Sequence, residues 1–110
     1  MSPTENASSA LLQHPPEDLH QVSEAGARLL KAIANKSRLL ILFKLLGREL
    51  SVTELNTEID ISQSSLSQHL AVLRHEGLVA TRRDGQTIFY SLSGIAPAQL
   101  LATLAEVLPS

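Results

Sequence analysis

The sequence lacks cysteine entirely and has no long apolar run. Without cysteine, the chain has no means to form disulfides, thiolate metal sites, cysteine nucleophiles or thiol redox switches. No apolar run approaches the roughly 18 residues of a membrane span. The N-terminus also has no basic segment leading into an apolar stretch, as a secretory signal would have. We therefore expect a cytoplasmic protein.

Residue arrangements typical of catalysis are missing as well. The sequence shows no Ser/His/Asp or paired-carboxylate arrangement with plausible spacing, and no glycine-rich phosphate loop. His69 and His75 are six residues apart on one expected helix, so a rotation of about 600° puts them on different faces, where they cannot chelate one metal. We therefore expect no enzyme, no cofactor and no metal site.

The net charge of −2 argues at first sight against a nucleic-acid partner. However, residues 1–24 hold four carboxylates and no Lys or Arg. Residues 25–110 therefore carry nine basic against seven acidic side chains. Because total charge hides this asymmetry, the distribution of charge has to decide the partner.

The length of 110 residues suits one domain that follows an N-terminal tail. Residues 1–17 are rich in Ser, Pro, Asn and Ala without a sustained period, which predicts a disordered N-terminal tail. The domain itself should span residues 18–108. Apolar spacing predicts helices at residues 18–34, 38–46, 63–76 and 98–108, a further short helix behind Ser51, and two strands at 79–83 and 86–92.

Local signals mark where these helices begin. Ser51 and Glu54 have the spacing of a capping box, and Ser62 suits a second N-cap. Residues 38–46 carry seven apolar residues out of nine, so we expect this helix to be buried nearly all round.

Asp84-Gly85 lies between the two expected strands and is a strong hairpin signal, because both residues of such a turn take positive φ. The predicted order is α-α-α-α-β-β-α, mainly helical with a small β-hairpin. Two short helices joined by a tight turn and followed at once by a hairpin predict a winged helix-turn-helix.

The expected helix at 63–76 has one apolar and one polar face. Leu66, Leu70 and Leu73 share the apolar face, and at 100° per residue Ser64 and Gln68 lie opposite them. Small hydroxyls and amides without carboxylates suit entry into the DNA major groove, since Gln pairs with adenine and Ser serves either partner. The predicted base contacts are Gln63, Ser64, Ser67 and Gln68.

Basic residues accompany this helix. Arg82 and Arg83 lie beside the hairpin turn, where a wing reaches phosphates or the minor groove. Serine and glutamine on their own are common on solvated surfaces, so it is the hairpin that favours DNA. The predicted backbone and wing contacts are Ser62, Arg74, Arg82, Arg83 and Gln86.

Three segments resemble the ArsR/SmtB family of repressors. They are ELSVTELNTEIDISQSSLSQHLAVLRHEGLV at 49–79, ANKSRLLIL at 34–42 and RRDGQTIFYSL at 82–92. The similarity covers about residues 18–108, and within the family the chain looks most like the NolR/HlyU/BigR branch. The resemblance implies a transcriptional repressor that binds an inverted repeat in promoter DNA as a homodimer.

The resemblance also implies that the first and last helices hold the dimer together. This agrees with their apolar stripes, which a domain this small would otherwise leave exposed. The predicted interface residues are Leu19, Val22, Leu29, Leu100, Leu101, Leu104, Val107 and Leu108.

The sensing sites of the family are where this sequence departs from it. Ser51, Thr53 and Asn56 stand at positions that supply thiolates in arsenic-type members, and hydroxyls and amides are poor ligands for soft metals. The last helix offers only Glu106 where zinc or nickel sensors have paired ligands. Phe43 stands where sulfide or oxidant sensors have a cysteine. We therefore expect a DNA-binding surface without the family's sensor.

Two alternatives stay open at this point. One is a winged-helix module that binds protein in place of DNA. The other is a repressor controlled by a metal bound through His14, His20, Glu17 and Asp18, or through Glu106; mobile ligands of this kind bind weakly without a preorganised shell.

Overall fold

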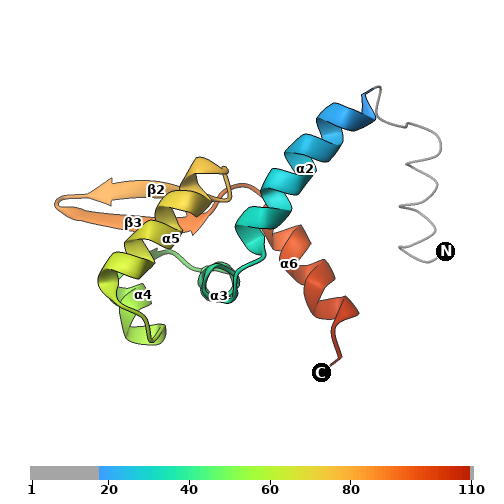
Figure 1. Ribbon diagram of the computed structural model, residues 1–110. Helices are drawn as coiled ribbons and strands as arrows, with labels where there is room; N and C mark the ends of the chain where they lie inside the picture. The colour runs from blue at the N-terminus through green and yellow to red at the C-terminus, as the bar shows by residue number, and fades with distance from the viewer. Residues whose placement is uncertain (1–17, 110) are drawn as a thin grey trace.

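The computed structural model describes residues 18–109, so the predicted tail at 1–17 lies outside the described residues. The elements follow the predicted order, with one added strand, and the mainly helical winged fold is confirmed (Figure 1). They are α2 (Leu19–Ile33), α3 (Lys36–Lys44), β1 (Leu50–Ser51), α4 (Val52–Glu58), α5 (Gln63–His75), β2 (Val79–Asp84), β3 (Thr87–Leu92) and α6 (Ala96–Val107).

Side-chain caps start the four helices α2 to α5. Ser51 and Glu54 form the predicted capping box on α4, with the Ser51 hydroxyl accepting from the Glu54 amide and the Glu54 carboxylate accepting from the Ser51 amide. Asp18 caps α2, Asn35 caps α3 and Ser62 caps α5. Each such cap is worth about 1 kcal/mol, because it satisfies backbone N–H groups that have no partner within the helix.

The core lies where α3, α4, α5 and the sheet meet. Leu66, Leu70 and Leu73 are each at most 1% exposed, which confirms the predicted apolar face of α5. Ile41, Leu42 and Leu45 of the α3 segment, together with Leu55, complete the most deeply buried set.

The prediction that the 38–46 segment is buried nearly all round is wrong for the described chain. Leu40, Phe43 and Leu46 remain 37%, 38% and 43% exposed. One side of α3 packs on α5 and α6. The contacts of α3 with α2, α5 and α6 leave these three side chains partly exposed, so a strongly apolar composition did not produce complete burial.

The hairpin belongs to a three-stranded antiparallel sheet of order β1-β3-β2. The sequence prediction missed β1, in which Leu50 pairs with Tyr90 and Ser51 with Phe89. The predicted turn is also one residue out of place. Asp84 pairs with Thr87 in the ladder, so the turn residues are Gly85 and Gln86.

Of the two turn residues only Gly85 has positive φ, +65°, which matches the sign pattern of a type II′ turn. The expectation that Asp84 takes positive φ is therefore wrong. A two-residue turn of this type still keeps the right-handed twist of the strands, so the hairpin forms as predicted with a shifted register.

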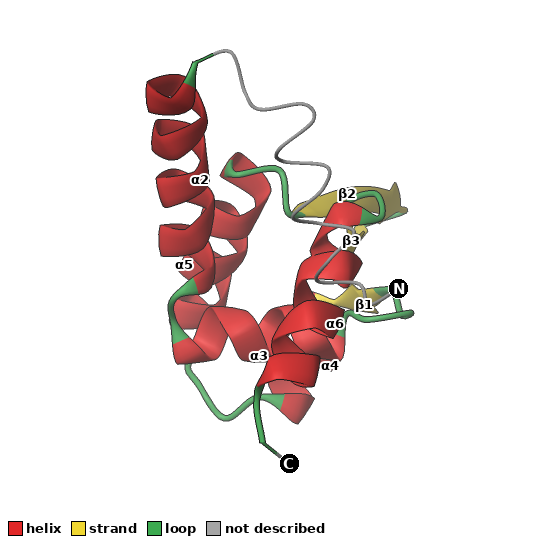
Figure 2. Cartoon of the chain, turned by 90° about the vertical axis from the view of Figure 1, so that its right-hand side faces the viewer, coloured by secondary structure: helices red, strands yellow, loops and turns green. Residues whose placement is uncertain are grey.

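The overall arrangement separates two ends of the molecule. The β2–β3 hairpin projects from one end, and α2 and α6 lie at the other (Figure 1). Seen from the side, α2 and α5 lie next to each other along one flank, and α6 and the sheet lie along the other (Figure 2). The helix-turn-helix of α4 and α5 thus lies between the wing and the α2/α6 end.

Candidate nucleic-acid interface

The N-terminal half of α5 presents the polar side chains predicted to contact bases. Gln63, Ser64, Ser67 and Gln68 are all exposed, whereas the leucines on the other side of the helix are buried. Because those leucines anchor α5 in the core, its polar face is held rigidly outward. The structure therefore brings all four residues onto one accessible surface.

A serine cluster organises the start of this helix. The Ser62 hydroxyl accepts from the Ser65 amide at 3.1 Å, donates to the Ser65 hydroxyl at 2.9 Å, and lies 3.2 Å from the Ser64 hydroxyl. Ser65 was not among the predicted contacts, although its spacing of three from the N-cap serine was an available signal. The free amides at a helix N-terminus are suited to a phosphate oxygen.

The wing holds its two arginines differently. Arg82 crosses β3, with its guanidinium 4.8 Å from the centre of the Phe89 ring, and binds Glu49 beside β1 through hydrogen bonds of 2.7–3.1 Å. This pairing lowers the pKa of the Glu49 carboxyl and raises the pKa of Arg82. Arg83 is exposed and has no ion-pair partner among residues 18–109.

The acidic segment 49–60 is largely engaged in local structure. Glu58 binds Arg48 at 2.6 Å and Lys44 at 3.5 Å, and the hydrogen bond from Arg48 lowers the pKa of the Glu58 carboxyl. Glu54 belongs to the capping box, and Glu49 binds Arg82. These contacts offset much of the negative charge near the helix-turn-helix, so net charge is a poor guide to the partner here.

The remaining predicted contacts lie at the edges of this surface. Arg74 is exposed in the last turn of α5, where a cation also complements the helix dipole. Gln86 is exposed in the wing turn. The wing tip, the exposed half of α5 and its last turn therefore offer polar or basic side chains over adjoining elements.

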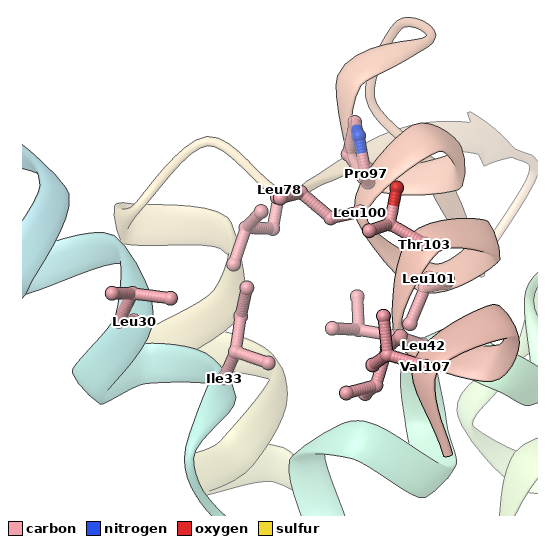
Figure 3. Close-up of a pocket in the computed structure, with 10 residues that line it drawn as sticks. Leu30, Ile33, Leu42, Leu78, Pro97, Leu100, Leu101, Thr103 and Val107 are labelled. Atoms are coloured by element: carbon pink, nitrogen blue, oxygen red, sulfur yellow. The ribbon is translucent and has the colours of Figure 1, made fainter. Parts of the chain in front are cut away.

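At the opposite end, α2 and α6 border an apolar cavity of about 240 Å³. Leu30 and Ile33 of α2 face Leu101 and Val107 of α6 across it, with Leu78 at its edge (Figure 3). Leu30 is 62% exposed and was not among the predicted interface residues.

The predicted interface residues divide by burial. Leu101 is only 2% exposed and packs in the core of its own protomer, which corrects its expected place on an outer surface. Leu29 is partly buried against that core, and Leu104 is half-buried and lines the cavity. The exposed members are Leu19, Val22, Leu100, Val107 and Leu108.

Residues 18–109 contain neither a membrane-spanning helix nor a cluster of metal ligands. None of the described helices has both the length and the apolar character needed to cross a bilayer. In the same part of the chain, no three His, Cys, Asp or Glu side chains gather closely enough to hold a metal ion.

Comparison with known proteins places these features in a family. Residues 35–81 match the family described as "Bacterial regulatory protein, arsR family". The chain is 45% identical over 96 residues to the nodulation protein NolR of Rhizobium meliloti, covering 87% of this chain and 79% of NolR. It is 52% identical over 85 residues to the transcriptional activator HlyU of Vibrio cholerae, covering 74% and 79%.

A solved structure agrees with the sequence matches. The transcriptional repressor BigR from Xylella fastidiosa superposes with a TM-score of 0.76 at 39% identity, covering 86% of this chain and 96% of BigR. The fold, the helix-turn-helix and the sequence thus indicate the same family. The chain belongs to the ArsR family of bacterial regulatory proteins, which are DNA-binding transcription regulators with a winged helix-turn-helix.

Proposed function

We propose that this protein is a homodimeric, sequence-specific repressor that occupies an inverted-repeat operator and so blocks access to a promoter. The observation that carries the proposal is the exposed, carboxylate-free N-terminal half of α5, which is anchored from behind by three buried leucines and flanked by a wing. Residues 18–108 form the DNA-binding and dimerisation unit in this proposal, which acts on double-stranded DNA in the cytoplasm.

In the proposed complex, α5 enters the major groove. Gln63, Ser64, Ser67 and Gln68 contact base edges, as amides and hydroxyls of a groove-inserted helix do. The backbone contacts come from five further residues, which are Ser62, Arg74, Arg82, Arg83 and Gln86. Arg83 is the stronger wing candidate, because Arg82 has to exchange its contacts with Glu49 to bind a phosphate.

The apolar surface of α2 and α6 supports the dimer. Leu19 is 65% exposed, Val107 69% and Leu108 55%, and the intervening cavity is almost entirely apolar. A soluble domain of this size rarely leaves such a surface uncovered. A twofold axis through it makes the contact self-complementary and presents two α5 helices to two half-sites.

Signal sensing in this repressor does not use the thiolate sites of arsenic- or redox-responsive relatives, since the chain has no cysteine. The polar residues at the arsenic-type positions also make structural hydrogen bonds. Ser51 is buried in the capping box, and the Asn56 amide donates to the Ile61 carbonyl at 2.8 Å. Neither side chain is free to bind a metal without breaking a local contact.

A mobility-shift titration tests the proposal. The probe is a duplex carrying the sequence upstream of the protein's own gene, compared with a scrambled duplex of equal length over a salt series. We expect preference for the upstream duplex and a linear fall of log affinity with log salt, because bound phosphates release counterions. Affinity without salt dependence contradicts the proposal and favours a protein-binding module. A change on adding zinc or a chelator favours metal control.

A further inference from the structure

Two exposed cations of α2 have no role in the protomer's own fold. Arg28 and Lys31 lie three residues apart on this helix. At 100° per residue both face away from its apolar stripe, so the proposed dimer contact does not use them. Neither side chain forms an ion pair among residues 18–109. The fold therefore leaves two positive charges here that are free to bind something else.

These two cations border a cleft of about 210 Å³ between α2 and α5, which we call the α2/α5 cleft. Arg38 of α3 also lines it, and Val72 and Glu76 line it from α5 and the C-cap of that helix. Three cations thus share the cleft with one carboxylate, which in the described part of the chain pairs with none of them. A concave surface with this excess of positive charge attracts anions.

Hydrogen bonds hold one of these charges, that of Arg38, in place. Its Nε donates to the carbonyl of Ala32, and its Nη2 donates to the carbonyl of Lys31 at 3.2 Å. These carbonyls belong to the end of α2, where helix carbonyls lack partners within the helix. Its Nη1 lies 3.3 Å from Nδ1 of His69 on α5. The guanidinium is therefore fixed within the cleft, and its charge adds to that of the two exposed cations.

The α2/α5 cleft lies beside the polar face of α5. Val72 and Glu76 come one and two turns after Gln68, a predicted base contact, on a neighbouring side of the helix. The hairpin extends from α5 on one side and α2 lies on the other (Figure 1). A helix in the major groove has a phosphate backbone along each side, and such phosphates fix its register. The wing is placed toward one of these backbones, and the cleft toward the other.

We propose that Arg28 and Lys31 bind backbone phosphates of the operator on the α2 side of α5, with the fixed charge of Arg38 strengthening the attraction. The inference rests on the proposed DNA contact of α5 and on the proposed dimer. With the twofold axis at the surface of α2 and α6, the cleft faces the centre of the operator and the wing faces its outer ends. The two cations therefore contact phosphates between the half-sites, which the wing does not reach.

The test compares wild type with the double variant Arg28→Gln/Lys31→Gln in mobility shifts on the upstream and scrambled duplexes over a salt series. Both side chains are exposed, so the urea midpoint should stay unchanged. We expect about tenfold weaker binding to both duplexes and a salt slope flattened by about two, since each lost phosphate contact removes about one. The control Gln99→Glu/Ala102→Glu makes the same change in net charge, with the same spacing, at exposed positions of α6. It should keep the wild-type slope.

Ethylation interference on the upstream duplex locates the contacts. Ethylated phosphates between the half-sites should block binding by wild type but not by the double variant, whereas Arg83→Gln should lose only interference at the outer ends. An unchanged central pattern and slope in the double variant overturns the inference and leaves the proposed function standing. If inorganic phosphate raises the melting temperature of wild type alone while DNA binding of the double variant is unchanged, the cleft is a small-anion site and the inference is wrong. Wild type without salt-dependent duplex binding refutes the proposed function and this inference with it.

Discussion

Replacing Val107 by aspartate tests whether the apolar surface of α2 and α6 joins two protomers. Val107 is 69% exposed in the protomer, so its side chain contributes little to the fold and has most of its area left to bury. Full burial of such a side chain is worth about 2 kcal/mol. Burying the exposed share is therefore worth about 1.4 kcal/mol. In a twofold dimer both copies of Val107 are buried, so the contribution is doubled.

Loss of about 3 kcal/mol raises the dimer Kd roughly 100-fold, and an unpaired buried carboxylate weakens association further. Sedimentation velocity over a concentration series measures this shift. The matched control is Ala102→Asp, an exposed position on α6 that does not line the apolar cavity and should leave the dimer unchanged. A Val107→Asp protein with wild-type dimerisation would refute the reasoning and place the interface elsewhere.

Leu101, six residues away on the same helix, should behave differently from Val107. It is 2% exposed and packs in the protomer's core. We expect Leu101→Ala to lower the free energy of unfolding by about 2–5 kcal/mol. Urea denaturation measures this directly, and an unchanged midpoint would show that Leu101 is not a core residue.

Three further predictions concern DNA contacts and pH. Gln68→Ala should weaken binding to the operator by about 1–3 kcal/mol and leave scrambled duplex nearly unaffected; equal loss on both in a mobility-shift assay argues against base contact. Arg83→Ala should weaken binding to both duplexes and flatten the salt slope by about one, and an unchanged slope contradicts the phosphate role. Because the pKa of Glu49 is held below its ordinary value of 4.5 by Arg82, its stabilisation is present above that pH and is lost as pH falls below it. Urea midpoints of wild type and Glu49→Gln should therefore differ at pH 7 and converge near pH 3; a constant gap contradicts the ion pair.

Local features of the structure were readable from the sequence because short-range spacing creates them. The capping box of Ser51 and Glu54 needs only residues three apart, and the buried face of α5 needs only leucines at helical spacing. β1 was missed since two residues carry no period, and the hairpin turn was placed one residue early because Asp84 can pair in the ladder as well as turn.

The candidate site was predicted where it depends on one helix and not where it depends on distant elements. The exposed face of α5 follows from its own periodicity. The pairing of Arg82 with Glu49 joins residues 33 positions apart, and that of Arg38 with His69 joins residues 31 apart. Spacing within a segment holds no information about such contacts, because they form only when separate elements meet.

The sequence by itself determined the helices, the hairpin, the polar face of α5 and the absence of thiol chemistry. These depend on periodicity, caps and composition. Only the tertiary structure decided that Leu101 is core while Val107 is exposed, that Arg82 is engaged while Arg83 is free of ion pairs among residues 18–109, and that Arg38 reaches His69 on α5. The physical reason is that the role of an apolar or basic side chain depends on which residues of other elements lie against it. Those neighbours are set by how the elements pack.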